Sequence, residues 1–466
     1  MKRIPCFNRA MTLVVALFTA PLLAAEPADS GSEIEQLRKE IVQMKLDYET
    51  RIADLERRLD AAEESQARPV AEAPPARAAE EYAYDPEPLD VSPTMTSSGR
   101  DNSFNPAIGV TLQGQAWSYG DGPDEYYIPG FPLGGEAGPP LEGLSLAESE
   151  ITMSANVDDK FMAMLTVPIV IEDGETVVEL EEAWVETLAL PAGLALRMGR
   201  FFADVGYLNT KHFHSWDFAD QPLVYQAFLG NQYIDDGLQL RWLAPADFYL
   251  EFSGEILRGD RYPAGGAARS GVGSGTLSVK TGGDIGFSNS WLFGLSWIGA
   301  EADERESGSE DDPLLFTGDT DIYIADFVWK WAPMGNSRQQ NFKFQAEYMW
   351  RKEDGFYNLP EDLELPWDEQ QQGWYAQAIY QPFPRWRFGV RYDRLSGAST
   401  DLVYFGTPLY SPGSDPERFS AMVDWSNSEF SRLRLQYELD HSGAEDDHLF
   451  GLQYIFSIGA HGAHSF

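Results

Sequence analysis

Histidines and carboxylates gather in one long segment of the chain, between Arg200 and Leu238, that shows no regular strand pattern. Imidazole and carboxylate groups are typical ligands of Zn²⁺ and similar divalent cations, and His212 and His214 in an extended segment would present both rings to one ion. Alternatively, the two histidines pack or hydrogen-bond the segment against its surroundings, or are simply exposed. The candidate residues of this segment are His212, His214, Trp216, Asp217, Asp220, Asp235 and Asp236.

A second pair of histidines lies near the C-terminal end. His441 and His448 flank an acidic turn at residues 445–447, and we treat them as further candidate cation ligands. His461 and His464 fall on opposite faces of an extended chain, which argues against a shared ion. Apart from a divalent cation such as zinc or calcium at these histidines, no cofactor is expected.

Basic residues line one face of three segments in the last quarter of the chain. These residues are Arg387, Arg391, Arg418, Arg432 and Arg434. If the acidic segment around His212 lies opposite them, the two charged strips create a transverse field that sorts ions by sign and orients polar solutes. The alternative is a set of salt bridges along the same face, with Glu347, Asp393, Asp424 and Glu438 as the partners.

No group of residues predicts catalysis. A hydrolytic enzyme needs a nucleophile with a histidine placed beside it, and the six histidines have no such motif nearby. We therefore expect a protein that is not an enzyme. The acidic run at residues 301–312 is interpreted as a solvated external face, and a divalent-bridged contact with lipopolysaccharide is the alternative.

The segments that would position these groups alternate apolar and polar residues with a period of two. Phe342, Phe344 and Tyr348, for example, alternate with polar residues such as Lys343 and Gln345. Beyond the N-terminal region the chain lacks the ~20 consecutive apolar residues of a membrane helix, so this alternation predicts spanning strands with one lipid face and one wet face. About sixteen segments show it. They begin near Ile108, Ile151, Phe161, Val177, Leu194, Leu238, Phe248, Leu277, Trp291, Tyr323, Phe342, Trp374, Trp386, Phe419, Leu433 and Phe450.

Tight turns follow the even-numbered segments, and longer polar loops follow most odd-numbered ones. We predict an all-β fold, a transmembrane antiparallel β-barrel of about sixteen strands, over residues 105–466. The His212 segment is then the third external loop, and the arginines line the pore wall. The aromatic terminus at Phe466 resembles the signal read by the barrel-assembly machinery.

The region before the barrel divides into three parts. Residues 1–25 are typical of a cleaved secretory signal. Residues 26–65 repeat apolar residues at spacings of three and four, which predicts an α-helical coiled coil in the periplasm. Residues 66–104, rich in Pro, Ala and Glu, are expected to be a disordered linker. A motif that resembles a trimerisation signal, with a dimer or an isolated helix as alternatives, consists of Arg51, Ile52, Leu55 and Glu56.

The net charge and the secretory signal together limit the location and the partners that we expect for the protein. The formal net charge of −40 repels nucleic acid and attracts cations. We expect the outer membrane of a Gram-negative bacterium, with membrane lipid and lipopolysaccharide around the barrel.

The chain resembles trimeric outer-membrane porins of the phosphate-selective porin superfamily, especially the dicarboxylate type with an N-terminal coiled coil. The local motifs that carry this resemblance lie at residues 199–202 and 217–222. The resemblance implies that the third external loop, which carries His212, folds inward as the pore constriction. The stretch 178–245 also resembles proteobacterial proteins labelled zinc-regulated or TonB-dependent outer-membrane receptors. A barrel of about 22 strands with a plug domain would need several hundred more residues, so energised transport is not expected.

These observations predict a passive, trimeric porin for small hydrophilic solutes, favouring cations and linked to divalent metal such as zinc. Two alternatives stay open. In one, the barrel only anchors an adhesive or envelope-tethering coiled coil. In the other, the protein is a high-affinity metal receptor whose zinc binding depends on His212 and His214.

Overall fold

The computed structural model describes residues 106–120, 126–134, 137–172, 175–266, 271–308, 313–359, 363–413, 415–443 and 446–459. All of them belong to a compact unit that spans Leu89–Phe466. The expected signal peptide, coiled coil and linker lie outside the described residues, as does the C-terminal tail from residue 460 onward. The trimerisation motif, Arg51, Ile52, Leu55 and Glu56, is therefore also outside them.

The described residues form one antiparallel sheet that closes on itself. Its strands are β1 (Ala107–Ser118), β2 (Gly143–Ser145), β3 (Ser149–Asn156), β4 (Phe161–Glu172), β5 (Glu175–Val178), β6 (Glu182–Thr187), β7 (Leu194–Phe202), β8 (Ile234–Leu243), β9 (Tyr249–Leu257), β10 (Ser274–Ile285), β11 (Asn289–Ser307), β12 (Leu314–Trp331), β13 (Asn341–Leu359), β14 (Leu363–Phe383), β15 (Trp386–Ser396), β16 (Glu417–Ser428), β17 (Ser431–His441) and β18 (Asp447–Gly459). β2 and β3 both pair with β1, and β5 and β6 both pair with β4, so each couple forms one interrupted wall strand. β18 pairs with β1, and the predicted barrel of sixteen wall strands is confirmed.

Alternation sorts the side chains between the outside and the inside of the barrel. In β17, Leu433 and Leu435 are 41% and 59% exposed, while Arg434 and Gln436 are 1% and 4% exposed. An apolar outer face suits acyl chains, and a closed sheet leaves no unpaired strand edge exposed to them. None of the described helices is long and apolar enough to cross a bilayer.

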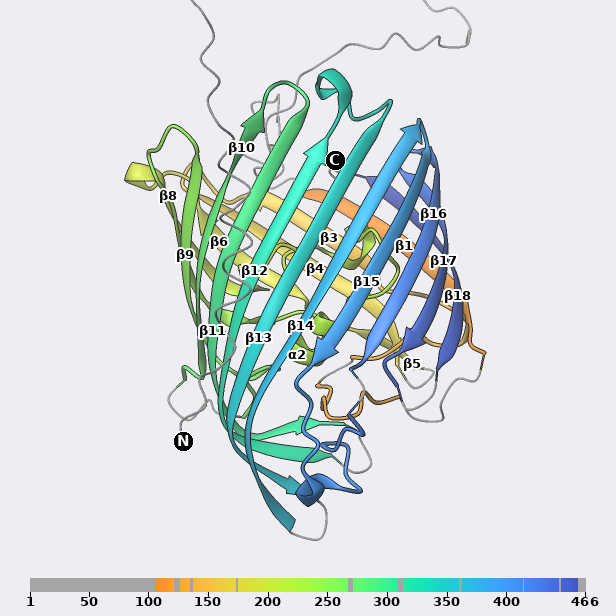
Figure 1. Cartoon of the computed structure of the whole chain (residues 1–466). Helices are drawn as coiled ribbons and strands as arrows, with labels where there is room; N and C mark the ends of the chain where they lie inside the picture. The colour runs from red at the N-terminus through yellow and green to blue at the C-terminus, as the bar shows by residue number, and fades with distance from the viewer. Residues whose placement is uncertain are drawn as a thin grey trace, which may run out of the picture. The chain divides into compact units, whose positions relative to one another are not determined.

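Two strands begin well before the positions that the sequence suggested. β12 starts at Leu314 rather than near Tyr323, and β14 starts at Leu363 rather than near Trp374. The outer face of these early residues is polar, so the alternation that marks a lipid-facing strand is missing there. In Figure 1, these early parts of β12 and β14 extend beyond the lower end of the barrel as a paired ladder with β13. The loop between β15 and β16 lies at the same end.

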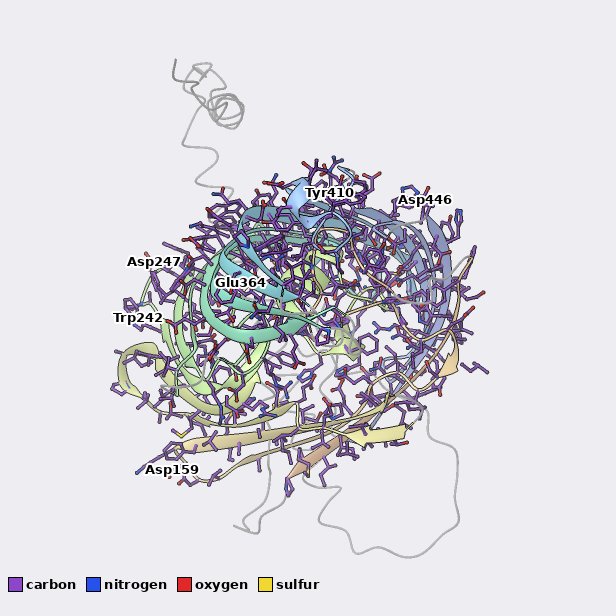
Figure 2. All side chains as sticks on the ribbon, turned by 90° about the horizontal axis from the view of Figure 1, so that it is seen from below. Asp159, Trp242, Asp247, Glu364, Tyr410 and Asp446 are labelled. Atoms are coloured by element: carbon purple, nitrogen blue, oxygen red, sulfur yellow. The ribbon has the colours of Figure 1, made fainter. Side chains whose placement is uncertain are left out.

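The connection between β7 and β8, residues 203–233, lies inside the barrel. It contains a 3₁₀ turn at Phe213–Ser215 and the helix α2 (Leu223–Leu229), in which every residue is buried. Gly230 ends the helix in the left-handed conformation, at φ 58°. Figure 2, seen along the barrel, shows side chains on both faces of the ring of strands.

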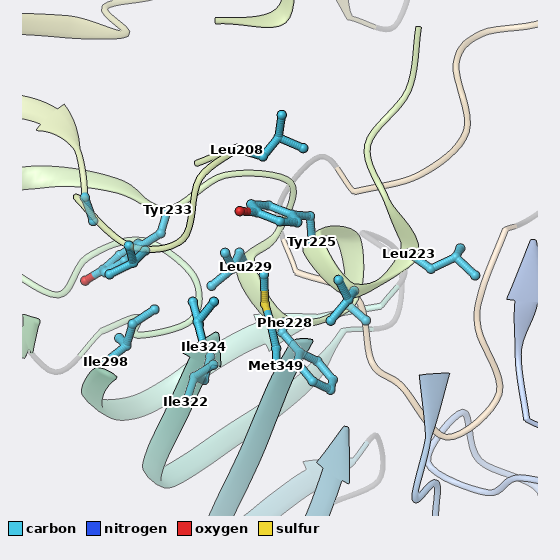
Figure 3. Packing of buried hydrophobic residues seen from close by; sticks show 14 of the residues in the cluster. Leu208, Leu223, Tyr225, Phe228, Leu229, Tyr233, Ile298, Ile322, Ile324 and Met349 are labelled. Carbon is cyan, nitrogen blue, oxygen red and sulfur yellow. The ribbon is translucent and has the colours of Figure 1, made fainter. Parts of the chain in front are cut away.

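Helix α2 packs against the inner face of β13, β14 and β15. Figure 3 shows Phe228 of this helix next to Met349 of β13, and Ile322 of β12 belongs to the same cluster. The largest apolar cluster among the described residues is therefore inside the barrel, between the loop and the wall. Burial of these side chains stabilises the inward position of the loop by ~1.5–3 kcal/mol for each large apolar group.

The prediction that Asp235 and Asp236 belong to this loop is wrong. Both lie in β8, where Asp236 forms a 2.7 Å ion pair with Arg200 and Asp235 accepts a hydrogen bond from the backbone N–H of Gly259. The strand begins at Ile234 because these bonds satisfy the aspartates inside the sheet. Asp has low strand propensity, so the sequence pattern placed the start at the first large outward-facing residue instead.

Candidate functional site

Two aspartates of the β7–β8 loop are anchored to basic side chains of the wall. Asp220 accepts from Arg391 at 2.5 Å and from Arg418 at 3.0 Å. Asp217 pairs with Arg387 and, at 2.5 Å, with Lys343. Burial alone would raise the pKa of the Asp217 carboxyl, but Lys343 and Arg387 outweigh that effect and hold this pKa well below its usual range.

The remaining arginines of the predicted wall ladder also reach the loop. Arg432 donates to the backbone carbonyl of His214 at 2.6 Å, and Arg434 donates to that of Trp216 at 2.9 Å. Arg434 further pairs with Asp424 of the wall at 2.8 Å. The arginines and the acidic loop are therefore in direct contact, and do not face each other across an open space as the transverse-field interpretation required.

Glu347 of β13 holds the beginning of the loop, and sequence reasoning gave it only the role of a wall salt bridge. Its carboxylate accepts backbone N–H groups from Tyr207 and Leu208 at 3.0 and 3.1 Å. It also accepts the hydroxyls of Tyr225 at 2.8 Å and Tyr375 at 2.5 Å. One carboxylate thus fastens the first residues of the loop and helix α2 to the wall.

Burial divides the inner face of the barrel into two regions. Where the loop covers it, charged side chains are almost inaccessible, and Arg391 and Arg418 are each 1% exposed. Toward the short turns, inward side chains keep partial exposure, such as 24% for Arg387 and 25% for Arg241. The partly exposed basic residues of this second region are Arg197, Arg241, Lys280, Lys330, Lys343, Arg387 and Arg432.

The acidic partners of these basic groups are buried, and they include Glu186, Asp204, Asp217 and Asp424. Glu186 is shared by Arg197 and Arg241, at 2.8 and 2.6 Å. Asp217 is likewise shared by Lys343 and Arg387.

The side chain of Tyr207 lies close to several lysines inside the barrel. Lys211 and Lys343 lie 5.5 and 5.6 Å from the centre of its ring. Burial would raise the pKa of Tyr207, but Lys343, Lys330 and Lys211 lower it below its ordinary value. The partly exposed charged side chains in this part of the interior are therefore mainly basic, although the whole chain carries a formal net charge of −40.

His212 and His214 meet carboxylates that the sequence analysis did not single out. The rings are stacked at 5.7 Å. His212 lies 3.1 Å from both Glu181 and Glu182, and His214 lies 2.8 Å from Glu150. Burial would lower the pKa of His212, but Glu181 and Glu150 raise it well above its ordinary value. Glu181 precedes His212 by 31 residues and Glu150 precedes His214 by 64, so no local motif marks these glutamates.

The other two candidate histidines are not brought to one site. His441, at the end of β17, lies 3.9 Å from Glu417 and 3.8 Å from Asp446. His448 of β18 forms a 2.8 Å hydrogen bond with the hydroxyl of Tyr437 and stacks on its ring. Within the described residues, a group of at least three side chains close enough to hold a cation is found at His212 and not at this pair.

A closed barrel of sixteen strands, with an apolar outer face and a long loop folded into its interior, defines a transmembrane β-barrel of the porin type. Comparison with models of known protein families finds no match. An uncharacterized protein of Aquifex aeolicus (strain VF5) is 33% identical over 341 residues, which cover 70% of each chain. The chain belongs to the same family as that protein.

Solved structures with related topology are outer-membrane proteins. They include the outer-membrane channel DcaP of Acinetobacter baumannii, at 12% identity and a TM-score of 0.47, covering 76% of this chain and 97% of that one. The anion-selective porin from Comamonas acidovorans has 10% identity and a TM-score of 0.47, over 76% and 99% of the two chains. The trimer form of OmpT of Vibrio cholerae has 9% identity and a TM-score of 0.46, over the same shares.

Proposed function

We propose that the protein is an outer-membrane porin through which small hydrophilic solutes diffuse passively, past a lumen narrowed by the β7–β8 loop. The observation that carries this proposal is the size of the barrel together with its wet inner face. Sixteen strands enclose more space than wall side chains fill. The region toward the short turns keeps charged groups such as Arg241 and Arg387 partly exposed.

The lumen charges support a preference for small anions. Net charge alone favours cations, and that was the expectation from the sequence, together with zinc uptake. Solute selectivity, however, depends on the charges that line the passage. Asp217 and Asp220 are neutralised by arginine and lysine, whereas Lys330 and Arg432 belong to the accessible basic region.

Conductance and reversal potential in planar bilayers test both statements. The purified protein should give single-channel current steps. Under a salt gradient, its reversal potential should have the sign that indicates preferential passage of anions. Replacing Lys330→Gln together with Arg432→Gln should move that potential toward the cation side, while Arg338→Gln, in an exposed turn, should leave it unchanged. A wild-type potential on the cation side rejects the anion preference, and an absence of steps rejects the channel.

A second candidate function, a barrel that serves as an anchor for the periplasmic region, is favoured by one observation. The inner faces of β13 to β17 are covered by the loop, as the low exposure of Arg391, Arg418 and Glu438 shows. A barrel sealed in this way would give no conductance in the wild type. Deletion of residues 213–229 would then create large steps, whereas in a porin it would only enlarge existing ones.

Self-association belongs to the same proposal. The motif Arg51, Ile52, Leu55 and Glu56 supports a trimer, because an arginine stem that covers a coiled-coil core while pairing with a neighbouring glutamate suits three helices. Native mass spectrometry of the full mature chain should give three copies. Arg51→Ala with Glu56→Ala should shift the distribution toward smaller species, and an unchanged trimer would assign assembly to the barrel instead.

A further inference from the structure

We propose that the β7–β8 loop contributes to a binding site for Zn²⁺ or a similar divalent cation, with Glu150, Glu181 and His212 as ligands. Nδ1 of His212 lies 3.1 Å from Oε2 of Glu181 and 3.5 Å from Oε2 of Glu150. One ligand atom from each of the three residues lies within 4.8 Å of the others. The ligands come from β3, from the residue before β6 and from the loop.

The two distances from His212 fit a tetrahedral zinc site. Zinc binds imidazole nitrogen and carboxylate oxygen at about 2.0–2.2 Å, so two ligand atoms at the tetrahedral angle stand roughly 3.3 Å apart. The two distances from His212 lie on either side of that value. Three protein ligands leave a fourth position for water or for an exchangeable ligand.

Two further residues are placed to orient the ligands. Oε2 of Glu182 lies 3.1 Å from Nε2 of His212, the nitrogen that faces away from the proposed cation. A carboxylate on the second ring nitrogen fixes the ring and raises the basicity of a metal-bound histidine. Nδ1 of His214 contacts Oε1 of Glu150 at 2.8 Å, which leaves Oε2 of the same carboxylate directed toward His212. Glu182 and His214 are therefore positioning residues.

The charge and burial of the group favour a divalent cation over sodium or potassium. Three carboxylates, Glu150, Glu181 and Glu182, surround one imidazole, and Glu150 is only 1% exposed. Buried carboxylates need compensation by a positive charge. The nitrogen ligand selects a borderline metal such as zinc over magnesium or calcium, which prefer oxygen ligands alone.

A cation at this position would fasten the loop to the wall at a second place. The ion pairs of Asp217 and Asp220 hold the loop to β13, β15 and β16, whereas the proposed site holds it to β3 and to the start of β6. The loop would then be fixed at both sides of the lumen. This consequence rests on the proposed porin function, but the presence of the site does not.

Zinc binding by the folded, metal-stripped full mature chain in detergent tests the site directly. Isothermal titration and elemental analysis with zinc should show one tightly bound ion per chain, which excess magnesium does not displace. His212→Ala and, separately, Glu181→Gln should abolish that binding. Glu182→Gln and His214→Ala should weaken it about 10- to 100-fold, as expected for residues that orient ligands.

Matched controls separate this site from other histidines. His448→Ala, which removes a histidine on the outer face of β18, should bind zinc like the wild type. Retained migration of unboiled protein as a compact species confirms that each variant is folded. Glu181→Gln, at a carboxylate ligand that is less buried than Glu150, tests the site if His212→Ala fails to fold. Wild-type zinc binding that is absent, is displaced by magnesium, or is equal in Glu181→Gln overturns the site.

Conductance gives an independent readout of loop fixation. Zinc should reduce current noise from loop movement in the wild type, and this effect should be lost in Glu181→Gln. If no channel forms while zinc still binds stoichiometrically, the porin function fails and the cation site stands. If channels form normally and no zinc binds, the cation site fails alone.

Discussion

The buried charges around Asp220 give a quantitative test of how the loop is held. Asp220→Asn keeps the shape of the side chain but removes the charge that faces Arg391 and Arg418. Breaking a buried ion pair costs ~3–5 kcal/mol. We expect the lower end, about 3 kcal/mol, because Arg391 keeps Asp393 at 2.8 Å and Arg418 keeps Asp440 at 2.6 Å.

Hydrogen exchange of the backbone amides in residues 213–229 measures the loss of free energy of loop docking. A cost of about 3 kcal/mol corresponds to a roughly 150-fold rise in the fraction of undocked loop, since each 1.36 kcal/mol is a factor of ten. Exchange in the loop should accelerate by that factor, while the wall strands keep their protection. The result distinguishes loop docking from barrel stability.

The same substitution at a partly exposed pair supplies the control. Asp236→Asn removes the partner of Arg200, and the two side chains are 44% and 25% exposed. An exposed pair contributes ~0–1 kcal/mol, so exchange in the loop should change less than about fivefold. Equal effects of the two substitutions, or an effect of Asp220→Asn below tenfold, would refute the buried network as the main fastening of the loop.

Three further substitutions test the packing of the loop, the wall and the outer face. Phe228→Ala should weaken loop docking by ~3–5 kcal/mol, seen as increased protease cleavage within residues 213–229, while exposed Phe287→Ala should have no effect. Gly199→Ala should reduce the yield of folded barrel on unboiled gels, because the new Cβ would stand 2.1 Å from the carbonyl oxygen of Ala183 at a φ of +125°. Leu435→Arg on the outer face should lower the free energy of unfolding in lipid by about 2–4 kcal/mol, and Leu402→Arg, in a loop, should leave it unchanged.

The strands of the barrel wall could be predicted from the sequence, because alternate residues face lipid and water. In β17, each apolar residue from Leu433 to Leu439 faces outward and each polar one inward, so the sequence itself carries the period. The rule fails where lipid is absent. The early parts of β12 and β14 lie beyond the apolar band, and their outer residues no longer need to be apolar.

The contacts of the side chains inside the barrel were harder to predict from the sequence, because they depend on where the β7–β8 loop lies inside the closed barrel. The period placed Arg391 and Arg434 correctly on the inner face, but nothing local indicated that Asp220 and the carbonyl of Trp216 would reach them. Loop and arginine are separated by 171 residues in the first case and 218 in the second. Likewise, Glu150 and Glu181 join His212 only after the strands have curved around the barrel.

The pairing of the first strand with the last has a consequence for how the chain is made. Gly109 aligns with Gly459 and Ser118 with Phe450, so the ring closes only when nearly the entire polypeptide is available. Contacts of such long sequence separation form slowly, since the entropy of a large loop is lost before they are gained. A shortened product that lacks β18 would present two unpaired edges to lipid, where backbone groups find no substitute partner. Biogenesis of this molecule should accordingly be all or none, with truncated chains degraded before they insert.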